Sequence, residues 1–432
     1  MDKYFEFRKH GTDMRTEILA GITTFLATMY IIVVNPAIIS STGMPFNGVL
    51  TATVLVSAFS SIAMGFYARN PILVAPGMGL NAFFTYTVVL GMQIPWQTAL
   101  GAVFWSGIIF ILLSIFNIRT QIVKAIPTQL RYAIAAGIGL FITLIGFTNA
   151  GFIVDNQATL ISRGGLTPSV LTFLVGFCVT AILVVKRNKG ALICGIVFTT
   201  LAAIPMGRIW GADQMVQWQG LMAMPDFSVF FQLDLVGSLK LSLIPVFFAF
   251  LFTDMFDSLS TFVGVAEAGN LKDEDGEPRN IRESLIVDGL STMISGLFGT
   301  SSGTSYIESA TGIEEGGRTG MTAVVAGLLF LPFMFLSPLL SIVPAIATAP
   351  ALVIVGVFMI RPVTMINWTE LDNAIPAFLA MFLIPATYSI TQGIIWGFLS
   401  WTVIKFTTGK RHEITPALLL IDLFAILSLV LG

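Results

Sequence analysis

The stretch GTSSGTSYIESATG, residues 299–312, interrupts a chain that is otherwise strongly apolar. It consists almost entirely of small or hydroxylated residues and carries one tyrosine and one acid, Glu308. Of the 432 residues, 55% are hydrophobic and only 11% are charged, with a mean hydropathy of +0.88. Soluble domains carry about 25% charged residues, so this composition indicates a polytopic membrane protein. Irregular backbone at membrane depth is tolerated only where it is buried in protein or lines a cavity.

Apolar stretches of membrane-crossing length fall into two sets of seven, with a polar, Trp-containing connection between them over residues 210–240. The first set begins near Ile18, Leu50, Leu73, Trp96, Leu130, Ser169 and Ala191, and the second near Leu243, Ser284, Thr304, Met321, Pro350, Ala374 and Ile394. With the N-terminus in the cytoplasm, only Arg163, Arg208 and Lys240 of the 22 Lys and Arg residues fall outside. This asymmetry agrees with the positive-inside rule. The apolar stretch 416–431 fits either a further span or a helix against the membrane.

Because seven is odd, the second set enters the membrane from the opposite side, which predicts inverted-topology repeats. SAFSSIAMGFYARN (57–70) resembles DGLSTMISGLFGTS (288–301), and IPTQLRYAIAAGIGLFI (126–142) parallels VPAIATAPALVIVGVFM (343–359). In this register NPILVAPGMGLNAFF (70–84) is the partner of the opening stretch, and both are broken third segments of their half. Paired broken segments at matching positions are the best sequence indication of a transporter's binding site.

Acids within the spans are the candidates for chemistry. Asp254 and Asp257 are three residues apart and share a helix face, which Thr261 continues one turn on; Glu308 lies in the broken segment. An acidic side chain inside the membrane is by default a candidate functional residue. A low dielectric disfavours its charged form and raises its pKa, so that it can exchange protons near neutral pH. The structural alternative is a neutral acid bonded to a neighbouring helix, and we favour it for Asp288, which lies nearer a helix end.

Asn81 is the polar residue of the first broken segment, and its amide offers both a donor and an acceptor; a capping or packing role is the alternative. Phe256, beside the acids, is a candidate to stack on a planar ring. GMGLNA (77–82) formally fits a dinucleotide fingerprint, but no βαβ unit surrounds it. His10 and His412 are far apart and suggest no metal site. A net charge of −2 gives no basic face for nucleic acid, and no cofactor motif or catalytic dyad is present, so we expect no enzyme.

The stretches APGMGLNAFFTY, DMFDSLSTFVGV and GTSSGTSYIESATGIEEGGRTG resemble the AzgA-like purine permeases, the adenine/guanine/hypoxanthine branch of the nucleobase:cation symporter-2 family. The resemblance covers essentially the whole chain. It implies an all-α polytopic membrane protein of 14 segments in 7+7 inverted repeats, with short strands in broken segments 3 and 10. It also implies a core domain and a gate domain. The expected boundaries are core 1–125 and 241–340, gate 126–209 and 341–409, an extracytoplasmic connection 210–240, and an unplaced C-terminal segment 410–432.

The resemblance also implies site residues. The acid that faces the base falls on Asp257, a second acid on Asp254, and the glutamate that holds the base on Glu308. Thr261 stands where the uracil branch carries a histidine, so proton coupling would rest on these three carboxylates. The remaining substrate contacts implied are Tyr306, Asn81 and Gly79, with Phe256 beside them.

Together with these residues, the resemblance implies a secondary transporter that imports a purine nucleobase (adenine, guanine or hypoxanthine) by proton symport through alternating access. The resemblance implies a homodimer, and we expect it in the inner (plasma) membrane; the charge pattern indicates a cytoplasmic N-terminus. Two alternatives remain open. A Na⁺-coupled purine carrier would use carboxylates and hydroxyls such as those of Thr253 and Ser260. An anion transporter of the same fold would need a basic residue or bare half-helix N-termini at the site, where the sequence places three acids and no Lys or Arg.

Overall fold

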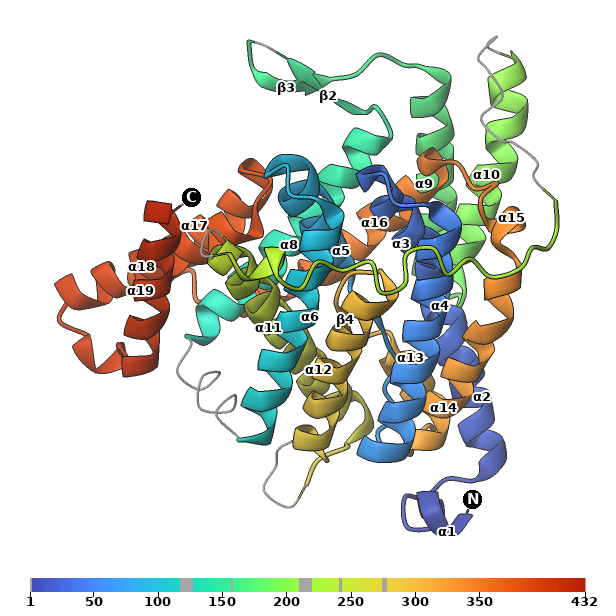
Figure 1. Ribbon diagram of the computed structural model, residues 1–432, viewed down its shortest axis with the longest axis horizontal. Coiled ribbons are helices and arrows are strands. Elements are labelled where there is room, and N and C mark those ends of the chain that lie inside the picture. The colour runs from blue at the N-terminus through green and yellow to red at the C-terminus, as the bar shows by residue number, and fades with distance from the viewer. Residues whose placement is uncertain are drawn as a thin grey trace.

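The computed structural model describes residues 2–116, 127–156, 158–209, 220–240, 243–273 and 278–431. The chain is mostly helical (Figure 1). Arg119, Lys124 and residues 210–219 of the expected connection lie outside the described residues, as do the side chains of Arg208 and Ser260. Seven described helices are long and apolar enough to cross a membrane by length and composition, and four shorter apolar helices accompany them.

Each segment of the first predicted set is present as one element or as a broken pair. They are α2 (Met14–Thr28) with α3 (Ile31–Ile39); α4 (Phe46–Ala63) with η2 (Met64–Ala68); β1 (Val74–Pro76) with α5 (Met78–Ala82) and η3 (Phe83–Gly91); α6 (Trp96–Ile115); α8 (Thr128–Asn149); α9 (Pro168–Val185); and α10 (Ala191–Ile209).

The second set is present in the same order. It comprises α11 (Ile244–Gly269); α12 (Ile281–Phe298); β4 (Gly303–Ser305) with α13 (Ser309–Glu314); α14 (Gly320–Phe330) with η6 (Leu331–Phe335); α16 (Ala345–Met359); α17 (Leu371–Ala386); and α18 (Ile390–Thr407). Short elements join these segments: α1 (Asp2–Phe5), η1 (Ser40–Thr42), the hairpin β2 (Ile153–Asn156) and β3 (Leu160–Arg163), η4 (Gly237–Leu239), α15 (Ser337–Leu340), η7 (Arg361–Met365) and η8 (Arg411–Glu413).

Side-chain caps fix where several helices begin. Asp13, Thr167, Thr319 and Ser389 precede α2, α9, α14 and α18, and each side chain accepts a hydrogen bond from a backbone N–H of the first turn. Such caps satisfy donors that a helix leaves without intrahelical partners. Short polar residues between apolar runs therefore set the starts of these segments.

Each broken segment contains a short strand, as expected, and the two strands pair antiparallel. Val74 pairs with Ser305, Ala75 with Thr304 and Pro76 with Gly303. The neighbouring helices complete the pairing: the Ser61 hydroxyl on α4 bonds both the N–H and the carbonyl of Val74, each at 3.0 Å. Backbone groups in an apolar surrounding cost several kcal/mol when unsatisfied, so a three-residue strand persists here only with such partners.

Glycines at helix crossings show the inverted repeat in the packing. A Cβ added at Gly65 would lie 2.3 Å from the carbonyl oxygen of Gly320 on α14. In the second half, a Cβ at Gly296 would lie 2.7 Å from the backbone nitrogen of Phe104 on α6. Gly65 and Gly296 are the matched glycines of the two repeats. Each brings segment 2 of its half against segment 4 of the other half.

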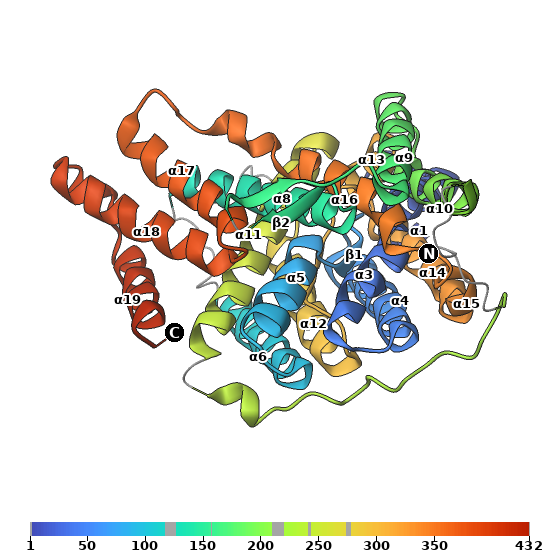
Figure 2. The ribbon, with the colours of Figure 1, turned by 90° about the horizontal axis from the view of Figure 1, so that it is seen from above.

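The helices pack in two groups (Figures 1 and 2). One group contains α8, α9, α10, α16, α17 and α18, and the other contains α2, α4, α6, α12, α13 and α14. Figure 2 shows α8, α9, α16 and α17 along one side and α4, α6 and α12 along the other. Helices α3 and α11 contact members of both groups.

The C-terminal apolar stretch, whose placement the sequence leaves open, forms α19 (Pro416–Leu431) beside α18. Leu418, Ile421, Asp422 and Ala425 are buried at helical spacing. The Thr402 hydroxyl of α18 lies 2.5 Å from Asp422 Oδ2. Helix α19 is therefore held on α18 by one apolar face and a polar contact.

Candidate functional site

A central cavity of about 460 Å³ lies where the strand pair meets both groups of helices. Tyr306, Glu308, Asp257, Thr261 and Gly79 line it among the residues that the sequence singled out. The group of helices that contains α8 and α16 contributes Ala135 of α8 and Val355, Phe358 and Met359 of α16. The cavity extends to Glu314 at the end of α13 and to Arg361 and Pro362 of η7. The two broken segments thus supply one wall of a chamber that continues to one end of the molecule.

Glu308 is held by a tyrosine from the first span. The carboxylate is half-buried, and its Oε1 accepts a hydrogen bond from the Tyr30 hydroxyl at 3.0 Å. Tyr30 is 1% exposed and lies at the break between α2 and α3, where it also lines the cavity. Glu308 itself directly precedes α13. Tyr30 thus binds Oε1 of a carboxylate that lines the cavity.

Asp257 and Asp254 have different surroundings despite their spacing on α11. Asp257 is half-buried and lines the cavity together with Thr261. Asp254 is 1% exposed, and its Oδ2 lies 2.6 Å from the Thr292 hydroxyl on α12. A separation of three residues leaves about 60° between two side chains on a helix, which is enough to direct them to different neighbours. Asp257 therefore faces the chamber, and Asp254 faces α12.

Thr292 links Asp254 to the second strand. Its hydroxyl lies 2.6 Å from Asp254 Oδ2 and 3.0 Å from the carbonyl oxygen of Gly303 in β4. One hydroxyl proton serves one acceptor well at a time. A protonated Asp254 would donate to the Thr292 oxygen and leave that hydroxyl free to donate to Gly303. The Thr292 side chain thus connects Asp254 to strand β4, which forms part of the cavity wall.

Asp288, for which the sequence favoured a structural role, is fully buried and accepts a hydrogen bond from the Ser305 hydroxyl at 2.8 Å. Ser258 and Thr304 hydroxyls lie 3.1 Å apart and join α11 to the same strand. Both contacts hold β4 against its helices. They therefore position the residues that follow it, Tyr306 and Glu308.

The remaining predicted residues are placed differently from one another. Tyr306 lines the cavity, and its hydroxyl donates to the Pro76 carbonyl at 2.5 Å. Gly79 also lines it, and a Cβ there would lie 2.6 Å from Ile138 Cγ2 of α8. Asn81 is fully buried and accepts a hydrogen bond from the Ser301 hydroxyl. Phe256 packs on Phe252, with ring centroids 5.8 Å apart. Neither Asn81 nor Phe256 is among the residues lining the cavity.

Sequence reasoning missed three kinds of lining residue. Tyr30 carries a weak signal, a tyrosine inside an apolar span just before a break. Phe358 and Met359 read as ordinary apolar helix residues. Arg361, placed in an inside loop by the charge pattern, lies at the mouth of the cavity with its guanidinium 5.4 Å from the Phe358 ring centroid. It is the basic residue among the described lining residues.

The chamber can bind a planar, uncharged molecule that donates hydrogen bonds. Two carboxylates, Asp257 and Glu308, supply strong acceptors, and the hydroxyls of Thr261 and Thr311 line the same space. Val355 and Phe358 add apolar surface to the same lining. Within the described residues, no group of three His, Cys, Asp or Glu side chains is placed to hold a metal ion.

Comparison with known sequences identifies the family. The sequence profile of the Permease family (Xan_ur_permease) matches residues 15–395. Adenine permease AdeP of Escherichia coli (strain K12) is 43% identical over 433 residues, which cover 100% of this chain and 96% of the relative. Guanine/hypoxanthine permease PbuO of Bacillus subtilis (strain 168) is 40% identical over 432 residues, covering 98% of each chain.

Solved structures show the same fold. The transmembrane domain of a cyanobacterium bicarbonate transporter, BicA, superposes with a TM-score of 0.66 at 16% identity, covering 88% of this chain and 97% of that one. The murine anion transporter Slc26a9 in its inward-facing state gives 0.65 at 11% identity, covering 91% and 69%. These likenesses confirm the predicted 7+7 inverted-repeat architecture and, at such identity, carry nothing about the substrate. Sequence match, repeat packing and paired broken segments agree: this chain is a multi-pass membrane protein that belongs to the Permease family, in the branch of the adenine and guanine/hypoxanthine permeases.

Proposed function

We propose that this protein imports purine nucleobases by proton symport. The observation that carries the proposal is the central cavity, in which Asp257 and Glu308, from two different segments, face one space between the two groups of helices. Relatives covering nearly the whole chain are permeases of adenine, guanine and hypoxanthine. A purine presents ring N–H and amino donors, and carboxylates are the strongest side-chain acceptors for them.

Glu308 is the residue proposed to hold the base. Tyr30 fixes its orientation through Oε1, so Oε2 would accept a hydrogen bond from the purine edge. Tyr306 and Phe358 would contact the faces of the ring from opposite walls of the cavity. Because Gly79 has no side chain, it would let the base come close to the backbone of the first broken segment. Asn81 and Phe256 lie behind the lining, and we propose that they act by supporting the two broken segments.

Proton coupling is proposed to rest on the carboxylates. Asp257 lines the cavity and would take up a proton together with the base; Glu308 is the second lining acid. Asp254 would take part through Thr292, which joins it to the site wall. Transport of one proton with a neutral base moves one charge, so a membrane potential drives it by about 2.3 kcal/mol per 100 mV.

In the proposed alternating access, the core domain moves against the gate domain, and each domain is made of two separate stretches of the chain. The core domain would comprise residues 1–125 and 241–340, and the gate domain 126–209 and 341–409, as the two packing groups support. The positive-inside pattern puts Glu314 and Arg361 on the cytoplasmic side, and the cavity extends to both residues. We therefore propose that this conformation faces inward, with a cytoplasmic N-terminus in the plasma (inner) membrane. We also propose that two copies associate through the gate domain.

Uptake of labelled adenine, guanine, hypoxanthine and uracil into vesicles, with pH and Na⁺ gradients imposed separately, tests the function. We expect a pH gradient alone to drive purine uptake. Uptake driven by a Na⁺ gradient alone would show that sodium, and not the proton, is the coupling ion. Uracil uptake without purine competition would contradict the proposed substrate class. Asp257→Asn and Glu308→Gln should abolish proton-driven uptake, whereas Asp155→Asn, on the exposed hairpin, should not. Unchanged uptake in both site variants would overturn the assignment.

A further inference from the structure

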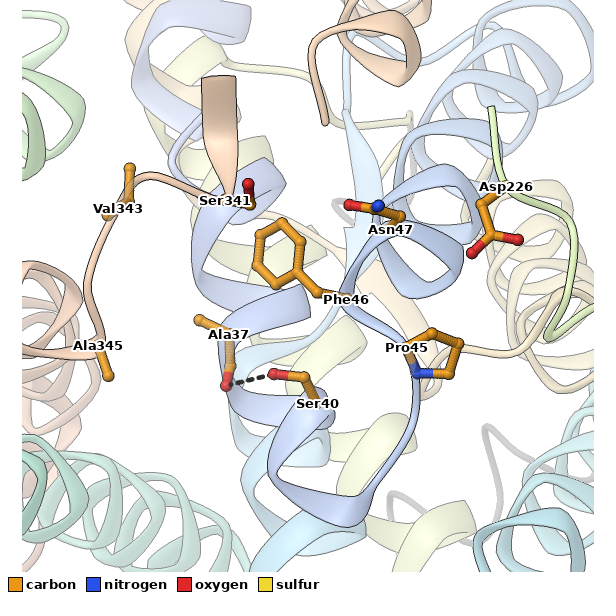
Figure 3. A pocket seen from close by; sticks show the side chains of 9 residues that line it. All are labelled: Ala37, Ser40, Pro45, Phe46, Asn47, Asp226, Ser341, Val343 and Ala345. Carbon is orange, nitrogen blue, oxygen red and sulfur yellow. Dashed lines mark hydrogen bonds between the residues drawn. The ribbon is translucent and has the colours of Figure 1, made fainter. Parts of the chain in front are cut away.

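A second cavity, of about 400 Å³, lies at the other end of the boundary between the two groups of helices. One wall comes from the end of α3 and the start of α4: Ala37, Ser40, Pro45, Phe46 and Asn47. Facing it are Ser341, Val343 and Ala345 between α15 and α16, and Asp226 of the connection closes one side (Figure 3). We call it the outer cavity, because the positive-inside pattern puts these loops outside.

The outer and central cavities share two helices. Segment 1 lines the central cavity through Tyr30 and the outer one through Ala37 and Ser40. Helix α16 lines the outer cavity at Ala345 and the central one at Val355 and Phe358. Between these levels, Ile31–Val34 of α3 and Ile346–Leu352 of α16 are buried. A mostly apolar stretch where α3 and α16 touch thus separates the two cavities.

The polar wall of the outer cavity is held in place by its own hydrogen bonds. Thr51 donates to the Asn47 carbonyl at 3.0 Å and accepts from the Asp226 N–H at 3.1 Å. Asp226 Oδ1 accepts from the Ser228 N–H at 2.9 Å. Its Oδ2 and the Asn47 side-chain amide have no hydrogen-bond partner among the described residues, and Asn47 is exposed. One carboxylate oxygen and one amide are therefore available in the lining of this cavity, with Asn47 between Phe46 and Asp226 (Figure 3).

We propose that the outer cavity is a second binding site, at which an uncharged planar heterocycle with N–H donors, the purine base itself, docks before it reaches the central cavity. The proposal rests on the proposed function. Asp226 Oδ2 accepts ring N–H donors, Asn47 completes the polar edge, and Phe46 contacts the ring. A volume of about 400 Å³ lies within the range of small-molecule sites, about 300–1,000 Å³. No Lys or Arg is among the described lining residues, so the site selects against anionic nucleotides.

Protection of a cysteine from labelling on intact cells tests this site. Cys178 and Cys194 are replaced by serine, Ser40→Cys is introduced in the cavity lining, and a membrane-impermeant maleimide is added with increasing adenine outside. We expect adenine to block labelling, with the same half-protecting concentration in a Glu308→Gln background. Asp226→Asn keeps the Oδ1 acceptor for Ser228 and removes the charge, so it should raise the half-protecting concentration about tenfold, as loss of a charge-assisted hydrogen bond does.

Controls separate this site from the central one. Asp155→Cys, on the exposed β2–β3 hairpin, should be labelled without protection, and Asp155→Asn should leave the half-protecting concentration unchanged. Protection that disappears with Glu308→Gln would show that the central site alone binds adenine, and absence of protection or of labelling at Ser40→Cys would equally overturn the proposal. If Glu308→Gln instead retains full proton-driven uptake, the proposed central site fails while the protection result still stands for the outer one.

Discussion

Replacing Tyr30 by phenylalanine removes one hydroxyl from the central cavity and little else. The ring is buried at 1% exposure and keeps its packing, because phenylalanine has the same shape without the oxygen. The lost contact is the 3.0 Å hydrogen bond to Glu308 Oε1. Without this donor, the carboxylate no longer has a fixed orientation from which Oε2 meets the base. We expect weaker purine binding with unchanged folding.

The size of the effect follows from the burial of the two partners. A hydrogen bond to a charged group contributes about 1.5–3 kcal/mol. Tyr30 is buried, but Glu308 is half-buried and faces the cavity, where water can replace the lost donor. The lower end of the range, about 1.5 kcal/mol, therefore applies, and it corresponds to about a tenfold increase in Kd.

Calorimetric titration of purified variants with adenine measures this change, and thermal unfolding in detergent measures stability. Tyr306→Phe is the matched control, because that hydroxyl donates to the Pro76 carbonyl rather than to Glu308; it should lower stability more than binding. In a double-mutant cycle, Tyr30→Phe should have little further effect once Glu308→Gln is present, with a coupling energy of about 1 kcal/mol or more. Additive effects, or an unchanged Kd in Tyr30→Phe, would refute the positioning role.

Three further experiments test the packing of the fold: two substitutions in the helices and a change of pH at the N-terminal segment. Thr292→Val should lower the free energy of unfolding by about 1–3 kcal/mol, because Asp254 and the Gly303 carbonyl lose a buried partner; Thr292→Ser should restore most of the thermal stability. Gly65→Ala places a Cβ 2.3 Å from the Gly320 carbonyl oxygen and should destabilise by on the order of 3 kcal/mol, whereas Gly165→Ala meets nothing within 4 Å and should be neutral in the same thermal assay. Burial, and then the neighbouring Arg279, hold the pKa of His10 below its ordinary value, and the Arg279 guanidinium donates to His10 Nδ1 at 3.2 Å only when that nitrogen is unprotonated. Docking of residues 4–10 is thus fully stable above about pH 6.5 and weakens as the pH falls below it; hydrogen exchange of this segment, corrected for intrinsic rates, should show this loss in the wild type and not in His10→Gln.

The segment order and the broken third segments were predictable because they depend on local composition. Charge placement along the loops fixed the count of crossings, and an odd count required inversion. The partner of Glu308 was not predictable, since Tyr30 lies 278 residues away in the sequence. The same limit applies to Asp254: helical spacing puts it near Asp257, but only the position of α12 shows that it bonds Thr292.

Residues 299–312 are mostly small or hydroxylated because the two broken segments meet here in an apolar surrounding. Gly303 has no room for a side chain, because a Cβ there would lie 2.0 Å from the Ser291 hydroxyl oxygen. Thr300, Ser305 and Ser309 each contact a polar group from elsewhere: the Asn35 amide, the Asp288 carboxylate and the Leu73 N–H. An isolated pair of short strands has little stability of its own, so β1 and β4 depend on these contacts and on each other. Since β1 comes from one half of the chain and β4 from the other, neither half can form the cavity wall that presents Glu308 without its inverted partner.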